Sequence, residues 1–114
     1  MEAQEKTVLT YVKDNGFVPF NDWLASLRDR KSRAIIRTRI NSIRLGNLGD
    51  CKSVGGGVSE LRINFGSGYR IYFAQQGNTI IILLSGGDKS GQDKDIKQAK
   101  LYWQDYKRRG NEQK

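Results

Sequence analysis

The stretch ELRINFGSGYRIYF, residues 60–73, decides the fold, because it is typical of two short strands joined by a Gly-Ser-Gly turn. Alternate side chains of a strand point to opposite faces, so one face of this hairpin is apolar and the other is polar. The apolar face has to pack on helices, and we therefore expect the polar face to look outward. Its members are Glu60, Arg62, Asn64, Arg70 and Tyr72.

A three-residue loop at residues 66–68 predicts how the two strands pair: Asn64 lies opposite Arg70, and Arg62 lies opposite Tyr72. Two guanidinium groups on one strand face repel each other unless an anion lies between them, and a phosphate accepts paired hydrogen bonds from such a fork. A neighbouring carboxylate would neutralise the same pair as a surface ion pair. The pattern alone leaves both interpretations open.

The segments around the hairpin predict a small α+β fold. Residues 7–12 are rich in β-branched side chains and predict a first strand, and residues 79–85, apolar on both faces, predict a central strand. Residues 19–46 carry the spacing of two helices packed as a hairpin, and a last helix follows a possible cap formed by Ser90 and Asp93. The expected order is β-α-α-β-β-β-α: a largely antiparallel four-stranded sheet covered by an N-terminal helical hairpin and a C-terminal helix.

Composition bounds the class of protein. The 114 residues are expected to form a single domain, residues 1–114. One cysteine excludes an intramolecular disulfide, and the lack of histidine excludes a Cys/His zinc site. The Gly-rich segment at residues 48–59 predicts a loop without the spacing of a nucleotide-triphosphate site, and the longest apolar run is too short to span a bilayer. We expect a soluble, cytoplasmic protein with no metal or cofactor.

The charge favours phosphate-rich or acidic partners. Lys and Arg number 20 against 12 Asp and Glu, a formal net charge of +8. Much of this charge lies on and just before the second predicted helix, where seven basic residues accompany one aspartate. The pattern is compatible with a solvated helix face or with a ridge that follows phosphates. The basic residues are Arg28, Arg30, Lys31, Arg33, Arg37, Arg39 and Arg44.

Three stretches taken together carry a resemblance to a known family. They are GNLGDCKSVGGGVSELR at residues 46–62, GYRIYF at residues 68–73 and LLSGGDKSGQDKDIKQA at residues 83–99, with Trp23 early in the first helix. The combination resembles the RelE/ParE superfamily of toxins and is most similar to its HigB-like branch, often labelled addiction-module killer proteins. The match extends over roughly residues 15–106.

The resemblance implies the toxin of a type II toxin-antitoxin system. RelE-like and HigB-like members are ribosome-dependent mRNA endoribonucleases that inhibit translation without a metal. The ribose 2'-OH attacks the adjacent phosphate and a 5'-OH is released. The implied partners are the ribosome, mRNA and a cognate antitoxin, expected to be a helix-turn-helix DNA-binding protein encoded beside the toxin.

The resemblance also implies roles for individual residues. Arg62 and Arg70 match the arginines of the family's LR and YR strands and would hold the scissile phosphate and its transition state. Lys89 stands where relatives place an acid such as arginine or histidine, and is assigned to leaving-group protonation or charge stabilisation. Relatives place the proton acceptor where this chain has Gln92 or Asp93.

The available substitutes for the proton acceptor are Glu60 and Tyr72, and neighbouring guanidinium groups are expected to lower the cost of a tyrosinate. Tyr72 would also suit stacking of a codon base. Lys52 resembles the basic loop residues that position the RNA backbone. The other candidate RNA-binding residues are Asn64, Arg33, Arg37, Arg39 and Arg44.

Two other functions stay open. The ParE branch has the same fold and poisons DNA gyrase without being an enzyme. A basic module that binds RNA without cleaving it is the other alternative, because no strong general base is visible in the sequence.

Overall fold

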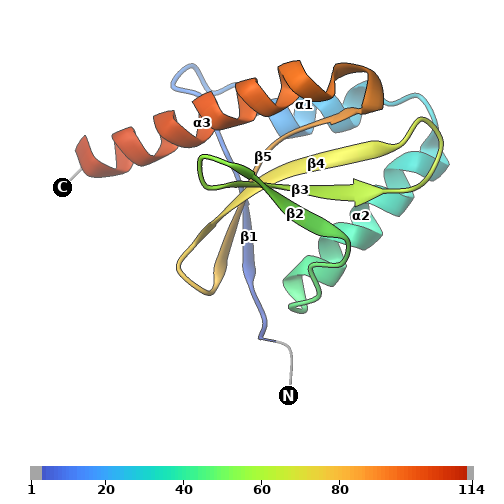
Figure 1. Ribbon diagram of the computed structural model, residues 1–114, viewed down its shortest axis with the longest axis horizontal. Coiled ribbons are helices and arrows are strands. Elements are labelled where there is room, and N and C mark those ends of the chain that lie inside the picture. The colour runs from blue at the N-terminus through green and yellow to red at the C-terminus, as the bar shows by residue number, and fades with distance from the viewer. Residues whose placement is uncertain (1–3, 113–114) are drawn as a thin grey trace.

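The computed structural model describes residues 4–112, within which five strands and three α-helices form (Figure 1). A short 3-10 turn, η1, precedes the last helix. In chain order the elements are β1 (Thr7–Thr10), α1 (Pro19–Ser26), α2 (Arg30–Arg44), β2 (Cys51–Gly55), β3 (Val58–Ile63), β4 (Tyr69–Gln76), β5 (Ile80–Asp88), η1 (Lys89–Gly91) and α3 (Gln92–Glu112).

The five strands form one sheet in the order β1-β5-β4-β3-β2. β1 runs parallel to β5, and the other three pairings are antiparallel, so the expectation of a largely antiparallel sheet is confirmed. The expectation of four strands is wrong, because residues 51–55 of the Gly-rich segment form β2 and pair with β3. Gly56 and Gly57, both with positive φ, make the tight turn between these strands.

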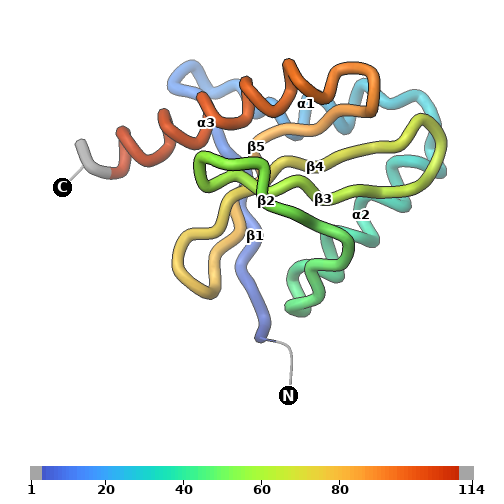
Figure 2. Tube along the Cα trace, viewed as in Figure 1, coloured from blue at the N-terminus to red at the C-terminus, as the bar shows by residue number. Residues whose placement is uncertain are grey.

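Helices cover both faces of the sheet. On one face, Phe20 of α1 and Ile36 of α2 join a core cluster with Leu61, Ile71 and other sheet residues. On the other face α3 crosses the sheet, as the chain traces in Figures 1 and 2 show. Its side chains form a second core with those of the sheet. The second core includes Val58, Tyr72, Leu84, Ala99 and Trp103.

Local signals place the helix ends. Pro19 occupies the first turn of α1, as expected from its fixed φ. The Asp29 side chain caps α2 by accepting a hydrogen bond from the backbone N–H of Lys31 at 3.0 Å. The expected Ser90–Asp93 cap does not form; instead the Asp88 carboxylate accepts from the Ser90 backbone at 2.9 Å and begins η1.

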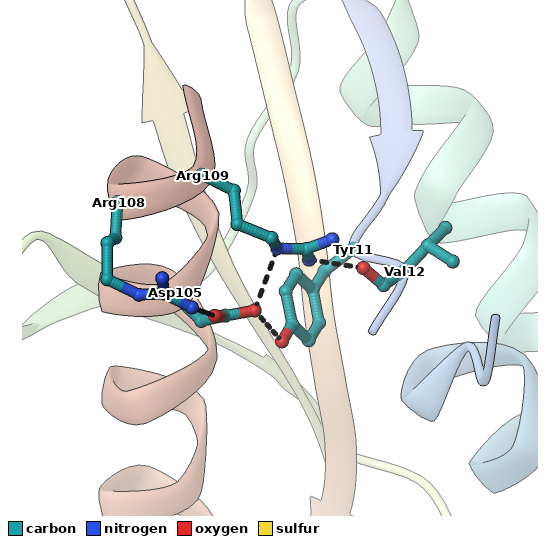
Figure 3. A network of polar contacts seen from close by, with 5 residues as sticks. All are labelled: Tyr11, Val12, Asp105, Arg108 and Arg109. Carbon is teal, nitrogen blue, oxygen red and sulfur yellow. Dashed lines mark hydrogen bonds and ion pairs between the residues drawn. The ribbon is translucent and has the colours of Figure 1, made fainter. Parts of the chain in front are cut away.

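A polar network joins the last turns of α3 to the segment that follows β1 (Figure 3). The Tyr11 hydroxyl donates to Asp105 Oδ2 at 2.6 Å, and Arg109 Nε lies 3.0 Å from the same oxygen. Arg109 also donates to the Val12 carbonyl, and its guanidinium lies 5.4 Å from the centre of the Tyr11 ring. Burial and the Asp105 carboxylate raise the pKa of Tyr11 to about 12. The network holds the C-terminal half of α3 against the sheet.

The core under α3 predicts a contrast between two leucines. Leu84 is fully buried, whereas Leu101 on α3 is 58% exposed. Replacing Leu84 with Ala should lower the free energy of unfolding by about 2–5 kcal/mol, because it leaves a cavity in the core. The matched change Leu101→Ala should cost less than about 0.5 kcal/mol. Urea denaturation followed by circular dichroism measures both; equal losses would contradict the placement of α3.

Candidate functional site

The β3–β4 hairpin sets the positions of the candidate site residues. Arg62 lies directly opposite Arg70, and Glu60 lies directly opposite Tyr72. The predicted pairings of Arg62 with Tyr72 and of Asn64 with Arg70 are therefore wrong, and the register differs from the prediction by two residues along the strand. β3 ends at Ile63, because the Ile63 carbonyl accepts from the Phe65 backbone at 2.9 Å and starts a five-residue turn. The shift preserves the face, so the expected grouping of side chains remains.

The Glu60 carboxylate stands between the two arginines. Its Oε1 lies 3.6 Å from Arg62 Nε and 3.6 Å from Arg70 Nη1. Its other oxygen, Oε2, accepts a hydrogen bond of 2.8 Å from Gln92 Nε2 at the start of α3. The Glu60 side chain is fully buried, that of Arg70 is 9% exposed and that of Arg62 is 37% exposed. The ion-paired interpretation thus describes the arrangement of these three side chains.

The expectation that this strand face looks outward is wrong. Glu60, Arg70 and Tyr72 are buried, because the N-terminal turns of α3 pack over them. Burial, together with the carboxylates of Glu60 and Asp95, raises the pKa of Tyr72 well above its usual range. The Arg70 guanidinium acts in the opposite direction but is outweighed, so the expected stabilisation of a tyrosinate does not occur.

Several donors and acceptors under α3 are buried without a hydrogen bond in the part of the chain that the structure describes. They share the strand face described above or its continuation on β5. These atoms are Glu60 Oε1, Arg62 Nε, Arg70 Nε, Tyr72 Oη and Ser85 Oγ. Unpaired buried donors are costly, and they bind an anion strongly when it reaches them.

Two residues that the sequence analysis did not single out bring α3 this close. Gly87 lies opposite Arg70 on β5, and a Cβ there would stand 2.0 Å from Asp95 Oδ2 of α3. Any larger residue would force the Asp95 carboxylate to move. Burial, and then the nearby Asp88 carboxylate, raise the pKa of Asp95. The Gly-Gly pair at residues 86 and 87, inside an otherwise apolar strand, is the signal that could have indicated this close approach.

Exposed cationic and amide groups lie around the buried side chains of Glu60, Arg70 and Tyr72. Asn64 and Lys89 are both exposed and line a pocket of about 310 Å³ with the hairpin turn, so the fold brings them together. Lys52 lies on β2 directly opposite Glu60 and is also exposed. Lys52 is thus next to Glu60 across the β2–β3 pairing, and Asn64 and Lys89 lie at the hairpin-turn end of the two arginine-bearing strands.

The basic residues of α2 are not part of this cluster, because α2 packs against the opposite face of the sheet. Arg33 donates to the Leu27 carbonyl, and Arg44 Nη1 donates to Asn41 Oδ1 at 2.7 Å. Arg39 packs on the backbone of residue 49, where a Cβ would meet its guanidinium. Arg37 is exposed. The chain therefore has two separate basic surfaces.

Among residues 4–112, no three metal-ligating side chains of His, Cys, Asp or Glu come together as a metal site would require. In the same part of the chain, no helix combines the length and apolar character needed to cross a membrane.

Comparisons with known proteins cover the whole candidate site. A family model described as Phage derived protein Gp49-like (DUF891) matches residues 22–107. A protein of Haemophilus influenzae, described as uncharacterized, is 49% identical over 105 residues, which is 92% of this chain and 97% of that protein. Every residue assigned to the site above lies inside the matched region.

The buried carboxylate predicts asymmetric effects of substitution. Glu60→Gln should lower the free energy of unfolding by about 3 kcal/mol, because it leaves the Arg70 charge buried without a carboxylate. Arg62→Gln should cost less than about 1 kcal/mol, because Arg62 is partly solvated and Glu60 keeps its other partner. Urea titrations measure the difference; similar small losses for both variants would show that Glu60 is not desolvated.

The raised pKa of Tyr72 predicts a loss of stability in alkali. Below the ordinary tyrosine pKa of about 10, the phenol is neutral in both folded and unfolded chains. As the pH rises further the unfolded chain ionises first, so the free energy of unfolding falls. Tyr72→Phe should make this fall shallower, and its difference absorbance should lack one late-titrating phenol. A wild-type chain whose five tyrosines all titrate near pH 10 would contradict the burial of Tyr72.

Proposed function

The chain belongs to the Gp49-like phage-derived family, an addiction-module toxin family related to the RelE/ParE-like toxins, and from this premise we propose that it is a HigB-like mRNA endoribonuclease. In this proposal it acts in the cytoplasm on mRNA bound to the ribosome and so inhibits translation. Its cognate antitoxin is a helix-turn-helix DNA-binding protein encoded beside it.

The proposed reaction is an internal transesterification. The ribose 2'-oxygen attacks the adjacent phosphorus, and the bond from phosphorus to the 5'-oxygen breaks. The 2'-hydroxyl proton passes to a base, and the departing 5'-oxygen gains a proton. The products are a 2',3'-cyclic phosphate and a 5'-hydroxyl, so no water or metal takes part in this step.

The observation that carries the proposal is the pair of arginines on neighbouring strands. Arg62 and Arg70 lie opposite each other, and each has a buried Nε without a hydrogen bond among the described residues. A buried guanidinium beside a partly solvated one, each held on a strand, suits the additional negative charge of a phosphorane. Arg62 is partly exposed and is the natural first contact for the scissile phosphate.

The exposed neighbours supply the other groups that the reaction needs. Lys89 directly follows β5 and begins η1, beside Asn64 and the hairpin turn, where it would protonate or stabilise the leaving oxygen. Asn64 and Lys52 would hold the RNA backbone on either side of the arginines. On the opposite face of the sheet, Arg33, Arg37, Arg39 and Arg44 would contact ribosomal RNA phosphates.

The proton acceptor in this proposal is Glu60 rather than Tyr72. The raised pKa of Tyr72 makes a phenolate scarce at neutral pH. Glu60 is held by Gln92 under the first turn of α3, so contact with a 2'-hydroxyl requires that turn to move off the sheet. On the ribosome, placing the RNA in an in-line geometry would supply much of the rate and make a modest base sufficient.

The same burial favours one alternative function. Because α3 covers Glu60, Arg70 and Tyr72, the chain would bind RNA through its exposed cations without cleaving it if the helix never moves. Such a module would show a steep salt dependence and no cleavage on programmed ribosomes.

The proposal predicts that Arg62→Ala cuts ribosome-bound mRNA at least about 100-fold more slowly than the wild type, because one donor to the transition state is lost. The matched control is Lys97→Ala, which removes an exposed cation from α3 away from the arginine pair and should keep the wild-type rate. Primer extension on programmed ribosomes measures both rates, and circular dichroism shows that both variants are folded.

Wild-type cleavage by Arg62→Ala would show that the arginine pair is not the site. A wild-type chain that cuts no message but inhibits purified gyrase at stoichiometric concentration in a supercoiling assay would instead favour the ParE-like function.

A further inference from the structure

A groove of about 700 Å³ lies at the end of the sheet away from the Arg62–Arg70 pair. It runs between the C-terminal half of α3, the β4–β5 turn and the segment after β1. Its volume is typical of a binding site. The residues that define it are Val12, Gln76, Trp103, Tyr106, Lys107 and Arg109.

The walls of the groove are held in place by side-chain contacts. The Tyr11–Asp105–Arg109 network fixes α3 to the segment after β1 (Figure 3). On the other side, Tyr106 Oη donates to Gln76 Oε1 at 2.9 Å and ties the helix to the end of β4. A groove that is already ordered loses little conformational entropy when a partner binds.

The chemistry of the lining favours an acidic peptide over RNA. Two cations, Lys107 and Arg109, line the groove, and no carboxylate does among the described residues. Trp103 is 7% exposed, and its ring already stacks on Tyr106, with Lys107 Nζ 5.3 Å from its centre. The indole therefore offers little surface for a nucleobase to stack on. Because Arg109 is already paired with Asp105, Lys107 supplies the main attraction.

The free edge of β1 opens next to this groove. Among the described strands β1 has a neighbour on one side only. The backbone N–H groups of Thr7 and Tyr11 donate to the side of β5. Because alternate residues of an extended strand direct these groups to opposite sides, those of Val8 and Thr10 point away from the sheet. An extended peptide can pair with such an edge.

Exposed apolar side chains accompany the edge. Leu9 is 44% exposed and Val12 is 41% exposed, and Val12 also lines the groove. A partner segment that pairs with β1 would place alternate side chains next to these residues.

We propose that this groove and the free edge of β1 dock an extended acidic segment of the cognate antitoxin. The segment pairs with the backbone of Val8 and Thr10, packs an apolar side chain beside Val12 and places a carboxylate near Lys107. This inference rests on the toxin assignment above, because it takes the antitoxin as the partner. It places the docking surface at the opposite end of the sheet from the arginine pair.

The test uses the purified product of the reading frame adjacent to the toxin gene, titrated calorimetrically into the full-length chain. Lys107→Glu should raise the dissociation constant at least about tenfold, because it reverses a charge in the docking groove. The matched control Lys97→Glu, on the same helix but outside the groove, should change it less than about twofold. In hydrogen exchange, the complex should protect the amides of Val8 and Thr10 and leave residues 60–73 unchanged.

The same affinity for Lys107→Glu as for wild type, no binding at all, or protection confined to residues 60–73 would overturn the proposal. Binding of an oligouridylate that is lost in Lys107→Glu, together with unchanged binding of the protein partner by the same variant, would also overturn the proposal. Growth arrest by the wild-type chain, expressed without the partner, is scored separately. Failure of the toxin assignment then appears as absent arrest, and failure of the docking site appears as unchanged affinity in a chain that still arrests growth.

Discussion

The buried carboxylate of Glu60 is the interaction on which the rest of the site depends. Two guanidinium groups on neighbouring strands repel each other, and removing them from water costs several kcal/mol per ion. Glu60 lies 3.6 Å from both and lets them remain side by side. Its second oxygen is occupied by Gln92, so the same carboxylate also fixes the first turn of α3. One carboxylate therefore links the ion pairs of the two arginines to the position of α3 over the sheet.

The arrangement has a consequence for access. The groups suited to phosphate chemistry stand partly under α3, whereas Lys52, Asn64 and Lys89 are open to solvent without any movement. Gly87 makes the closed arrangement possible, because its missing side chain leaves room for Asp95. A substrate that separates Gln92 from Glu60 would uncover the arginine donors that lack a hydrogen bond. The proposed reaction requires this movement.

Periodicity alone predicted what depends on local geometry. The helical spacing of residues 19–46 corresponds to a buried stripe of Ile36, Ile40 and Ile43 on α2. The site side chains share one strand face, because the period of two holds whatever the register. β2 was not predicted, because the glycines at residues 55–57 made the whole segment of residues 48–59 resemble a loop. The predicted register of the β3–β4 hairpin was wrong because Phe65 belongs to the turn, where its backbone N–H donates to the Ile63 carbonyl. The turn therefore has five residues instead of three.

Which face of the sheet is covered depends on tertiary packing, and no local pattern specifies it. The polar strand face resembled a solvent-exposed face, yet α3 lies on it, because Tyr72 and Leu84 on that same face complete an apolar core with Ala99 and Trp103. The separation of the two basic surfaces could not be predicted for the same reason, because the charges along α2 do not indicate which face of the sheet the helix covers. The resemblance correctly indicated a toxin family related to RelE and ParE, and the packing determines what the site residues can reach.

The most direct test of the central claim is the fate of a ribosome-bound message that carries one 2'-deoxynucleotide at the cleaved position. Attack by the neighbouring 2'-oxygen between two arginines predicts that the all-ribose message yields a 5'-hydroxyl fragment. The substituted message, bound equally well, should stay intact. Equal cleavage of both messages would contradict the account, because the phosphate would then be attacked by another nucleophile.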